Sequence, residues 1–140
     1  MKKNLVALCS RVSSNARKII VSELAKQGVT DIVPSHGSIL HLLYIREEVT
    51  MKEIADYVHK TKPTITVLVN KLEKLGYVVR EKSDEDNRVS YIKLTEKGHK
   101  LKPIFEKVSD YLNDKVYKNL DEKESELAKK VLEKVLENLD

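Results

Sequence analysis

The chain has 140 residues, of which 41% are hydrophobic and 34% charged, with a formal net charge of +4 and an isoelectric point near 9.0. This length predicts one domain with a real core, and the hydrophobic content excludes a disordered chain. No apolar run approaches the ~20 residues of a membrane span, and the single Cys9 excludes an internal disulfide. We therefore expect a cytoplasmic protein without a membrane partner, and the net positive charge permits a polyanionic partner.

Two helices are predicted in the first third of the chain. Apolar residues recur at helical spacing from Leu5 to Leu24, and this stripe predicts a helix that ends before Gly28. After that break, Ser35 is expected to cap a second helix that extends to about Ile45. Nearly all residues in the middle of the second helix are apolar, so we expect it to lie in the core.

A pair of helices with a tight connection follows. Thr50 and Glu53 have the spacing of a capping box, in which each side chain bonds the backbone N–H of the other residue, and they predict a short helix to about Val58. A short turn then leads to Thr61, which is expected to cap a further helix that ends before Gly76. Two helices joined by so short a turn are typical of a helix-turn-helix.

The apolar period then changes from helical to alternating. Residues 77–82 and 88–94 alternate as strands do, and residues 83–87 have the composition of a turn, so the sequence predicts a β-hairpin. Thr95 is expected to cap a long helix after the hairpin, and Asp121 is expected to cap a final one.

This order of elements predicts a mostly α (α+β) fold, a winged helix-turn-helix. A helix fits the major groove of B-DNA, and a hairpin beside it can reach the neighbouring minor groove. Considered alone, the polar residues of the helix after Thr61 are explained as well by an ordinary solvent-exposed face as by a DNA-binding face. The adjacent hairpin favours DNA binding. The candidate DNA-binding residues on this helix and just before it are Lys60, Lys62, Thr64, Thr66, Asn70 and Lys71.

Two motifs resemble the MarR family of transcription regulators. The first extends from the hairpin turn into the following helix, and its matching residues are Asp86, Arg88, Leu94, Thr95 and Gly98. The second motif is Leu72–Arg80, which resembles the segment that leads into the hairpin, or wing, in that family. With the predicted helix lengths, the resemblance covers nearly the whole chain.

The resemblance implies a homodimer that binds a pseudo-palindromic DNA duplex as a repressor, with half-sites about one helical turn apart. Residues 1–34 and 100–140 are expected to form the helical dimerisation region, and residues 35–99 the winged helix-turn-helix region. The apolar stripes of the terminal helices agree with a dimer, because a lone chain would leave them exposed.

The resemblance also extends the set of candidate site residues. Arg80 and Arg88 join the candidate DNA-binding residues, and Asp86 is expected to brace Arg88 in the wing. The alternative for Asp86 and Arg88 is a salt bridge that only shapes the turn. Pro63 and Val67 stand where the family often has polar or basic residues, so a different base preference is expected.

The resemblance further implies release from DNA by a small aromatic or anionic effector. Such a molecule is expected to enter the crevice between the dimerisation and DNA-binding lobes. By their positions in the chain, the candidate ligand-binding residues are Arg17, His36 and Tyr44.

Other functions remain as alternatives. Some relatives in this family sense peroxides through a cysteine on the first helix, so Cys9 is either a redox switch or a buried packing residue. A winged-helix module that only contacts proteins is a further alternative. Recognisable catalytic motifs are missing, and the histidines lack metal-ligand spacing, so we expect no enzyme, no metal site and no cofactor.

Overall fold

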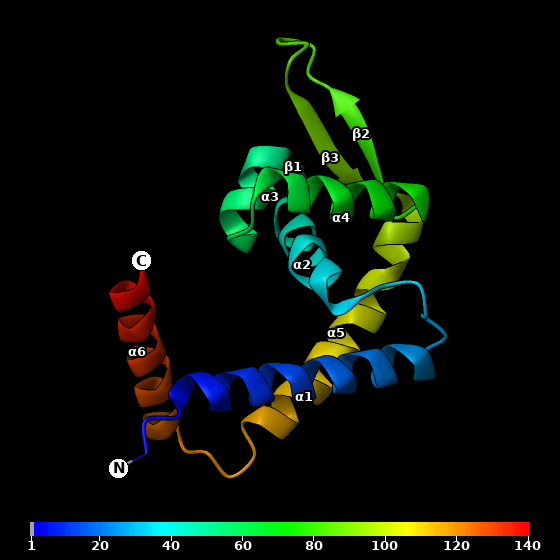
Figure 1. Ribbon diagram of the computed structural model, residues 1–140. Helices are drawn as coiled ribbons and strands as arrows, with labels where there is room; N and C mark the ends of the chain where they lie inside the picture. The colour runs from blue at the N-terminus through cyan, green and yellow to red at the C-terminus, as the bar shows by residue number, and fades with distance from the viewer. Residues whose placement is uncertain (1) are drawn as a thin grey trace.

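The computed structural model describes residues 2–140, so Met1 lies outside it, and the described part contains six α-helices, one short 3-10 helix and three strands (Figure 1). None of the described helices is both long and apolar enough to cross a bilayer. In chain order the elements are α1 (Leu5–Lys26), η1 (Pro34–His36), α2 (Gly37–Arg46), β1 (Glu48–Thr50), α3 (Met51–Val58), α4 (Lys62–Lys74), β2 (Val78–Lys82), β3 (Ser90–Leu94), α5 (Glu96–Val116) and α6 (Glu122–Leu139).

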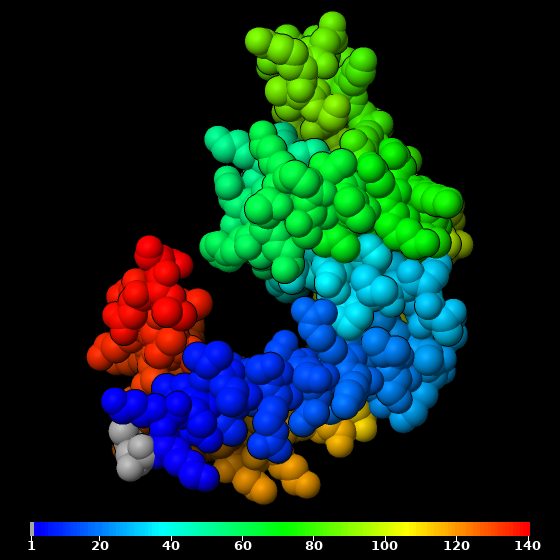
Figure 2. Space-filling model, in the orientation of Figure 1, coloured from blue at the N-terminus to red at the C-terminus, as the bar shows by residue number. Residues whose placement is uncertain are grey.

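These elements form two regions joined by α5. Helices α2, α3 and α4 pack together below the hairpin of β2 and β3, and α5 descends from the sheet to cross α1 at the other end (Figure 1). Helix α6 stands beside this body, and open space separates it from α2–α4 (Figure 2). The fold is the expected mostly α winged helix-turn-helix.

The core lies among α2, α3, α4 and the sheet. Ile39, Leu43, Ile54, Ile65 and Ile92 come from four helices or strands, and their side chains are completely buried. Each side chain of this kind contributes roughly 1.5–3 kcal/mol on burial, so this cluster fixes how α4 and the wing sit relative to each other.

Three predicted helix caps are confirmed. The Thr50 hydroxyl accepts the Glu53 N–H at 3.1 Å, and the Glu53 carboxylate accepts the Thr50 N–H. Thr95 Oγ1 accepts the Gly98 N–H at 3.1 Å. Asp121 caps α6 through the Glu124 N–H at 2.7 Å. These caps explain why α3, α5 and α6 begin where they do, since each satisfies a backbone donor without a partner in its own helix.

The predicted cap at Ser35 is wrong. Pro34 begins the 3-10 turn η1, so Ser35 lies inside that turn and α2 starts only at Gly37. The side chain that bonds the backbone here is His36, whose Nδ1 accepts the Val33 N–H at 3.2 Å.

The strand β1 was not expected from the sequence. It joins β3 to complete an antiparallel sheet of order β1-β3-β2, with Val49 opposite Ile92. Three residues are too few for an alternating pattern, and the pairing depends on a partner more than 40 positions away. Lys93 on β3 bridges Glu48 on β1 and Glu81 on β2, at 3.3 and 2.6 Å, so the sheet is also held across its exposed face.

Candidate nucleic-acid interface

The connection between α3 and α4 sets the direction of α4. His59 ends α3 in the left-handed region, at φ 57°, and the extended backbone of Thr61 then starts α4, with Pro63 in its first turn. Thr61 stands at the predicted cap position, but its hydroxyl pairs with the Thr64 hydroxyl at 3.1 Å rather than with a backbone N–H. The buried face of α4 carries Ile65 and packs on the core, which leaves the opposite face in solvent.

A basic hollow lies between the start of α3, α4 and the wing. Its volume is about 530 Å³. Four of the side chains that line it are basic, and none of the described lining residues is acidic. Since phosphate contacts dominate the affinity of proteins for DNA, this hollow has the charge that a DNA backbone requires. The residues that line it are Thr50, Met51, Lys52, Lys62, Ile65, Thr66, Arg80, Arg88, Val89 and Ser90.

Arg88 extends from the wing into solvent. Its side chain is 91% exposed, and its Nε lies 3.2 Å from Asp86 Oδ1. The same carboxylate oxygen accepts the Arg88 backbone N–H at 3.0 Å. That backbone hydrogen bond, followed by the side-chain one, lowers the pKa of Asp86 below its ordinary value. Asp86 thus holds both the turn and the guanidinium group, and the contact of Arg88 with DNA stays a prediction.

Arg80 is tied to α4. Its Nη2 donates to Asn70 Oδ1, and its Nε lies 3.6 Å from Glu73 Oε1. Two candidate DNA-binding residues, Asn70 and Arg80, are therefore brought together by the fold. Glu73 was not a candidate, and only the contact between α4 and β2 identifies it.

The other candidates on α4 and just before it lie in different surroundings. Thr66 is half-buried, and its hydroxyl donates to the Lys62 carbonyl at 2.9 Å, so this hydroxyl already has a partner in the helix. Lys60, Thr64 and Lys71 are exposed. Of these candidates, Lys62 and Thr66 share the basic hollow with Arg80 and Arg88.

Two further residues belong among the candidates. Lys52 lines the basic hollow from the first turn of α3, and Val67 is 68% exposed in the middle of α4. A lysine in a first turn opposes the helix dipole, and an apolar side chain in water gains nothing from exposure. Both features are visible in the sequence once the helix boundaries are known.

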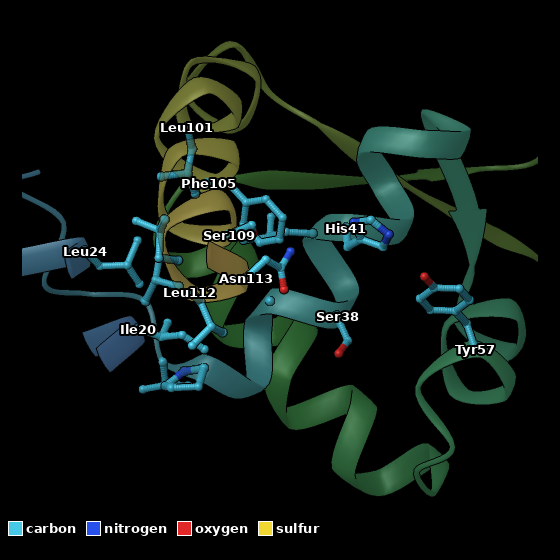
Figure 3. Close-up of a pocket in the computed structure, with 16 residues that line it drawn as sticks. Ile20, Leu24, Ser38, His41, Tyr57, Leu101, Phe105, Ser109, Leu112 and Asn113 are labelled. Atoms are coloured by element: carbon cyan, nitrogen blue, oxygen red, sulfur yellow. The ribbon is translucent and has the colours of Figure 1, made fainter. Parts of the chain in front are cut away.

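A separate cavity of about 380 Å³ opens among α1, α2, α3 and α5 (Figure 3). Ile20, Leu24 and Leu112 gather at one end of it, and His41 and Tyr57 lie toward the other (Figure 3). No lysine, arginine, aspartate or glutamate is among the described residues that line it. The cavity thus suits an apolar molecule with few hydrogen-bonding groups.

The structure does not bring the three ligand-binding candidates together. Arg17 is exposed on α1 and, within residues 2–140, is not part of the cavity lining. The Tyr44 hydroxyl donates to the Gly98 carbonyl at 3.0 Å, and burial raises the pKa of this hydroxyl. Tyr44 lines a smaller neighbouring hollow, which Lys102 also lines. His36 is buried in η1, with 2% of its surface exposed.

His36 makes folding sensitive to acid. Burial, followed by the positive charge of Lys71, lowers its pKa, and the Leu68 backbone, followed by the charge of Asp31, opposes this shift. Its Nε2 has no hydrogen-bond partner among the described residues. The His36 imidazole is protonated near pH 6.5 in the unfolded chain, whereas the folded chain resists its protonation. The neutral imidazole therefore contributes to the free energy of unfolding above pH 6.5, and this contribution is lost as the pH falls through the lowered pKa.

We therefore expect the free energy of unfolding of the wild type to fall more steeply between pH 7.5 and 5.5 than that of His36→Asn. The asparagine retains an acceptor for the Val33 N–H but does not titrate. Urea unfolding at several pH values measures the two slopes, and parallel slopes would show that His36 is protonated equally well in both states.

Cys9 is exposed on α1, so the interpretation of Cys9 as a buried packing residue is wrong for the single chain. The only buried residue of α1 is Leu24, near its other end, while Leu5, Leu8 and Val12 are exposed together with Cys9. The first half of α1 lies beyond the core of the chain, which explains the exposure. Its role as a redox switch stays a prediction.

The fold and the site define a winged helix-turn-helix protein. A sequence model of the MarR family matches residues 27–88. The HTH-type transcriptional regulator MhqR of Bacillus subtilis is 31% identical over 103 residues, which cover 73% of this chain and 70% of MhqR. The HTH-type transcriptional regulator SarZ of Staphylococcus haemolyticus is 37% identical over 79 residues, which cover 56% of this chain and 54% of SarZ.

A solved structure agrees with these sequence matches. The crystal structure of the S. aureus MepR–DNA complex superposes with a TM-score of 0.87 at 27% identity, and it covers 98% of this chain and 99% of that one. The chain belongs to the MarR family, as the two sequence motifs predict. The relatives named above are transcriptional regulators and not enzymes.

Proposed function

We propose that the chain is a cytoplasmic repressor that binds a pseudo-palindromic DNA duplex as a homodimer. The basic hollow between α3, α4 and the wing carries this proposal, because it combines an exposed helix face with cations on two sides. The DNA complex of MepR supports the same partner for the present chain. In this proposal residues 35–99 bind DNA, and residues 1–34 and 100–140 form the dimer.

The terminal helices support a second copy as the dimer partner. Helix α6 has no buried residue among its 18, although it carries a full apolar stripe. The first half of α1 exposes Leu5, Val6, Leu8 and Val12. Together these helices present an apolar surface of the kind that monomeric proteins rarely leave in water, and a symmetric dimer covers the same patch on both copies.

Arg88→Ala should lower the affinity for an operator duplex by roughly 5- to 100-fold, the range of a lost specific arginine contact, while the dimer persists. A mobility-shift titration measures the affinity, and sedimentation measures the dimer. Arg11→Ala removes the same charge from α1 and should leave the affinity nearly unchanged. Equal affinities of the wild type and Arg88→Ala would exclude Arg88 from the interface.

The same titration separates this proposal from a winged-helix module that contacts only proteins. A DNA-binding chain releases counterions from the duplex, so its affinity falls steeply as salt is added. A protein-contact module would show no salt-sensitive affinity for any duplex.

We further propose that the cavity of about 380 Å³ binds the effector, and that the effector is a small neutral aromatic molecule. A carboxylate placed there would lose its hydration without an opposing charge among the described lining residues, which is costly. The cavity borders α1 and α5 on one side and α2 and α3 on the other. A ligand that prefers one spacing of these helices therefore shifts the two copies of α4 relative to each other.

For this cavity, we expect 4-ethylphenol to lower DNA affinity more than 4-ethylbenzoate does, and Ser109→Leu to abolish the response. Ser109 lines the cavity, so leucine fills space there, whereas the control Ser109→Ala keeps the cavity open. Fluorescence anisotropy with a labelled operator measures the response. A stronger effect of the benzoate, or an unchanged response in Ser109→Leu, would contradict the assignment.

A further inference from the structure

Val67 lies at the centre of the exposed face of α4. An α-helix turns by about 100° per residue, so Val67 lies about 200° around the helix axis from the completely buried Ile65. This position is opposite the core, and the Val67 side chain is 68% exposed. Pro63 and Lys71, one turn before and one turn after, lie on the same exposed face. A helix that lies in the major groove with this face inward brings Val67 closest to the base edges.

The exposed face of α4 is otherwise polar or confined to the first turn. Among the described residues, Val67 is the only large hydrophobic side chain of α4 that is exposed. The neighbouring Thr66 is half-buried, and its hydroxyl donates to the Lys62 carbonyl. Thr64 is exposed in the first turn, where its hydroxyl pairs with the Thr61 hydroxyl. Val67 is therefore the side chain that presents an entirely apolar surface in the middle of this face.

An isopropyl group distinguishes thymine from the other bases. In the major groove, adenine and guanine present a ring nitrogen acceptor, cytosine presents an amino donor, and thymine presents the only methyl group. Valine against a polar edge displaces water without replacing its hydrogen bonds, which is costly. Valine against the thymine 5-methyl group removes apolar surface of both partners from water, which is favourable.

We propose that Val67 is a specificity-determining residue, which recognises one thymine of each half-site by packing against its 5-methyl group. This inference rests on the proposed function, because it requires α4 to lie in the major groove. The cations of the basic hollow are suited to phosphates, which are the same in every sequence, whereas the contact of Val67 depends on the base.

The test begins with a duplex selected from a randomised pool by the wild-type protein. Deoxyuridine then replaces each thymine in turn, at the same position of both half-sites, and fluorescence anisotropy gives the dissociation constants. This replacement removes the methyl group and keeps every hydrogen-bonding group of the base pair. At one position we expect an affinity loss of about fourfold per methyl group, or about 16-fold for both half-sites.

Val67→Ala should abolish this sensitivity, so that the variant binds the thymine and deoxyuridine duplexes within about twofold of each other. The variant should keep the fold, because the replaced side chain is largely exposed. Val79→Ala is the matched control, since it makes the same change at an exposed position of β2, outside the described lining of the basic hollow. It should retain the sensitivity of the wild type.

A second base pair separates the methyl group from the hydrogen-bonding pattern of thymine. Cytosine and 5-methylcytosine are placed in turn at the position located with deoxyuridine, opposite guanine in both half-sites. The two bases differ only in a methyl group that occupies the same place in the groove as that of thymine. Methylation should raise the affinity of the wild type by about fourfold per half-site and should leave that of Val67→Ala unchanged.

A wild type that binds every deoxyuridine duplex within about twofold of the thymine duplex would overturn the inference. Full sensitivity in Val67→Ala would also overturn it, because another side chain, such as Thr64, would then contact the methyl group. Cytosine methylation without effect on the wild type contradicts it as well. These outcomes leave the proposed function intact, whereas a chain that selects no duplex at all overturns the proposed function and this inference together.

Discussion

Replacing Leu132 and Leu136 with lysine should convert the chain to a monomer and lower its affinity for the operator by roughly 100- to 10,000-fold. Both side chains are exposed on α6, at 44% and 60%, and no residue of this helix is buried by the described part of the chain. In the dimer, binding of the first half-site raises the effective concentration of the second DNA-binding region at the other half-site, and a monomer loses that gain.

The control for this experiment is Glu133→Lys on the same helix. It changes the net charge as much as the double leucine variant does, and among residues 2–140 its only ion pair is an exposed one with Lys129 at 3.9 Å. It should remain dimeric and bind DNA at least as tightly as the wild type. Sedimentation equilibrium gives the oligomeric state and anisotropy gives the affinity. A double variant that stays dimeric would show that α6 lies outside the interface.

Gly98→Ala should destabilise the fold by about 3 kcal/mol, because the chain has no room for a side chain there. A Cβ atom at this position would lie 2.3 Å from the Tyr77 carbonyl oxygen and 2.9 Å from Leu94 Cδ2. The Tyr77 oxygen cannot retreat cheaply, since it accepts the Thr95 N–H at 3.0 Å. The first turn of α5 would therefore have to move away from the end of α4, and the wing would move with it.

Gly37→Ala provides the comparison. Its backbone is right-handed helical, and a Cβ there would meet only the Phe105 ring at an ordinary 3.8 Å. This variant should keep the wild-type stability or gain up to about 1 kcal/mol by restricting the unfolded chain. Urea unfolding at one fixed protein concentration measures both variants, since a dimer is more stable at higher concentration. Equal stability of Gly98→Ala and the wild type would contradict the close contact.

The local elements of this fold are predictable from the sequence because local rules produce them. The capping boxes at Thr50 and Asp121 depend on residues three positions apart, and both form. The wing turn depends on Asp86 and Arg88, which are two positions apart, and their hydrogen bonds are present. The order of helices and hairpin then follows from the apolar period alone.

Features that depend on distant contacts are not predictable in this way. The strand β1 exists because Val49 lies opposite Ile92, and three residues carry no period of their own. The bond between Asn70 and Arg80 crosses the turn between α4 and β2, so no spacing rule indicates it. The cavity combines residues from four helices, which explains why Arg17 and His36, chosen by position in the chain, are not part of its lining.

The central claim is that two copies of α4 bind one duplex on the same face. It is tested most directly by titrating a selected duplex against a version with about five extra base pairs, roughly half a helical turn, between its half-sites. We expect two chains per duplex in sedimentation, and a large loss of affinity on insertion, because the half-sites then lie on opposite faces. Binding of one chain per duplex, or an affinity that the inserted base pairs do not change, would contradict the account.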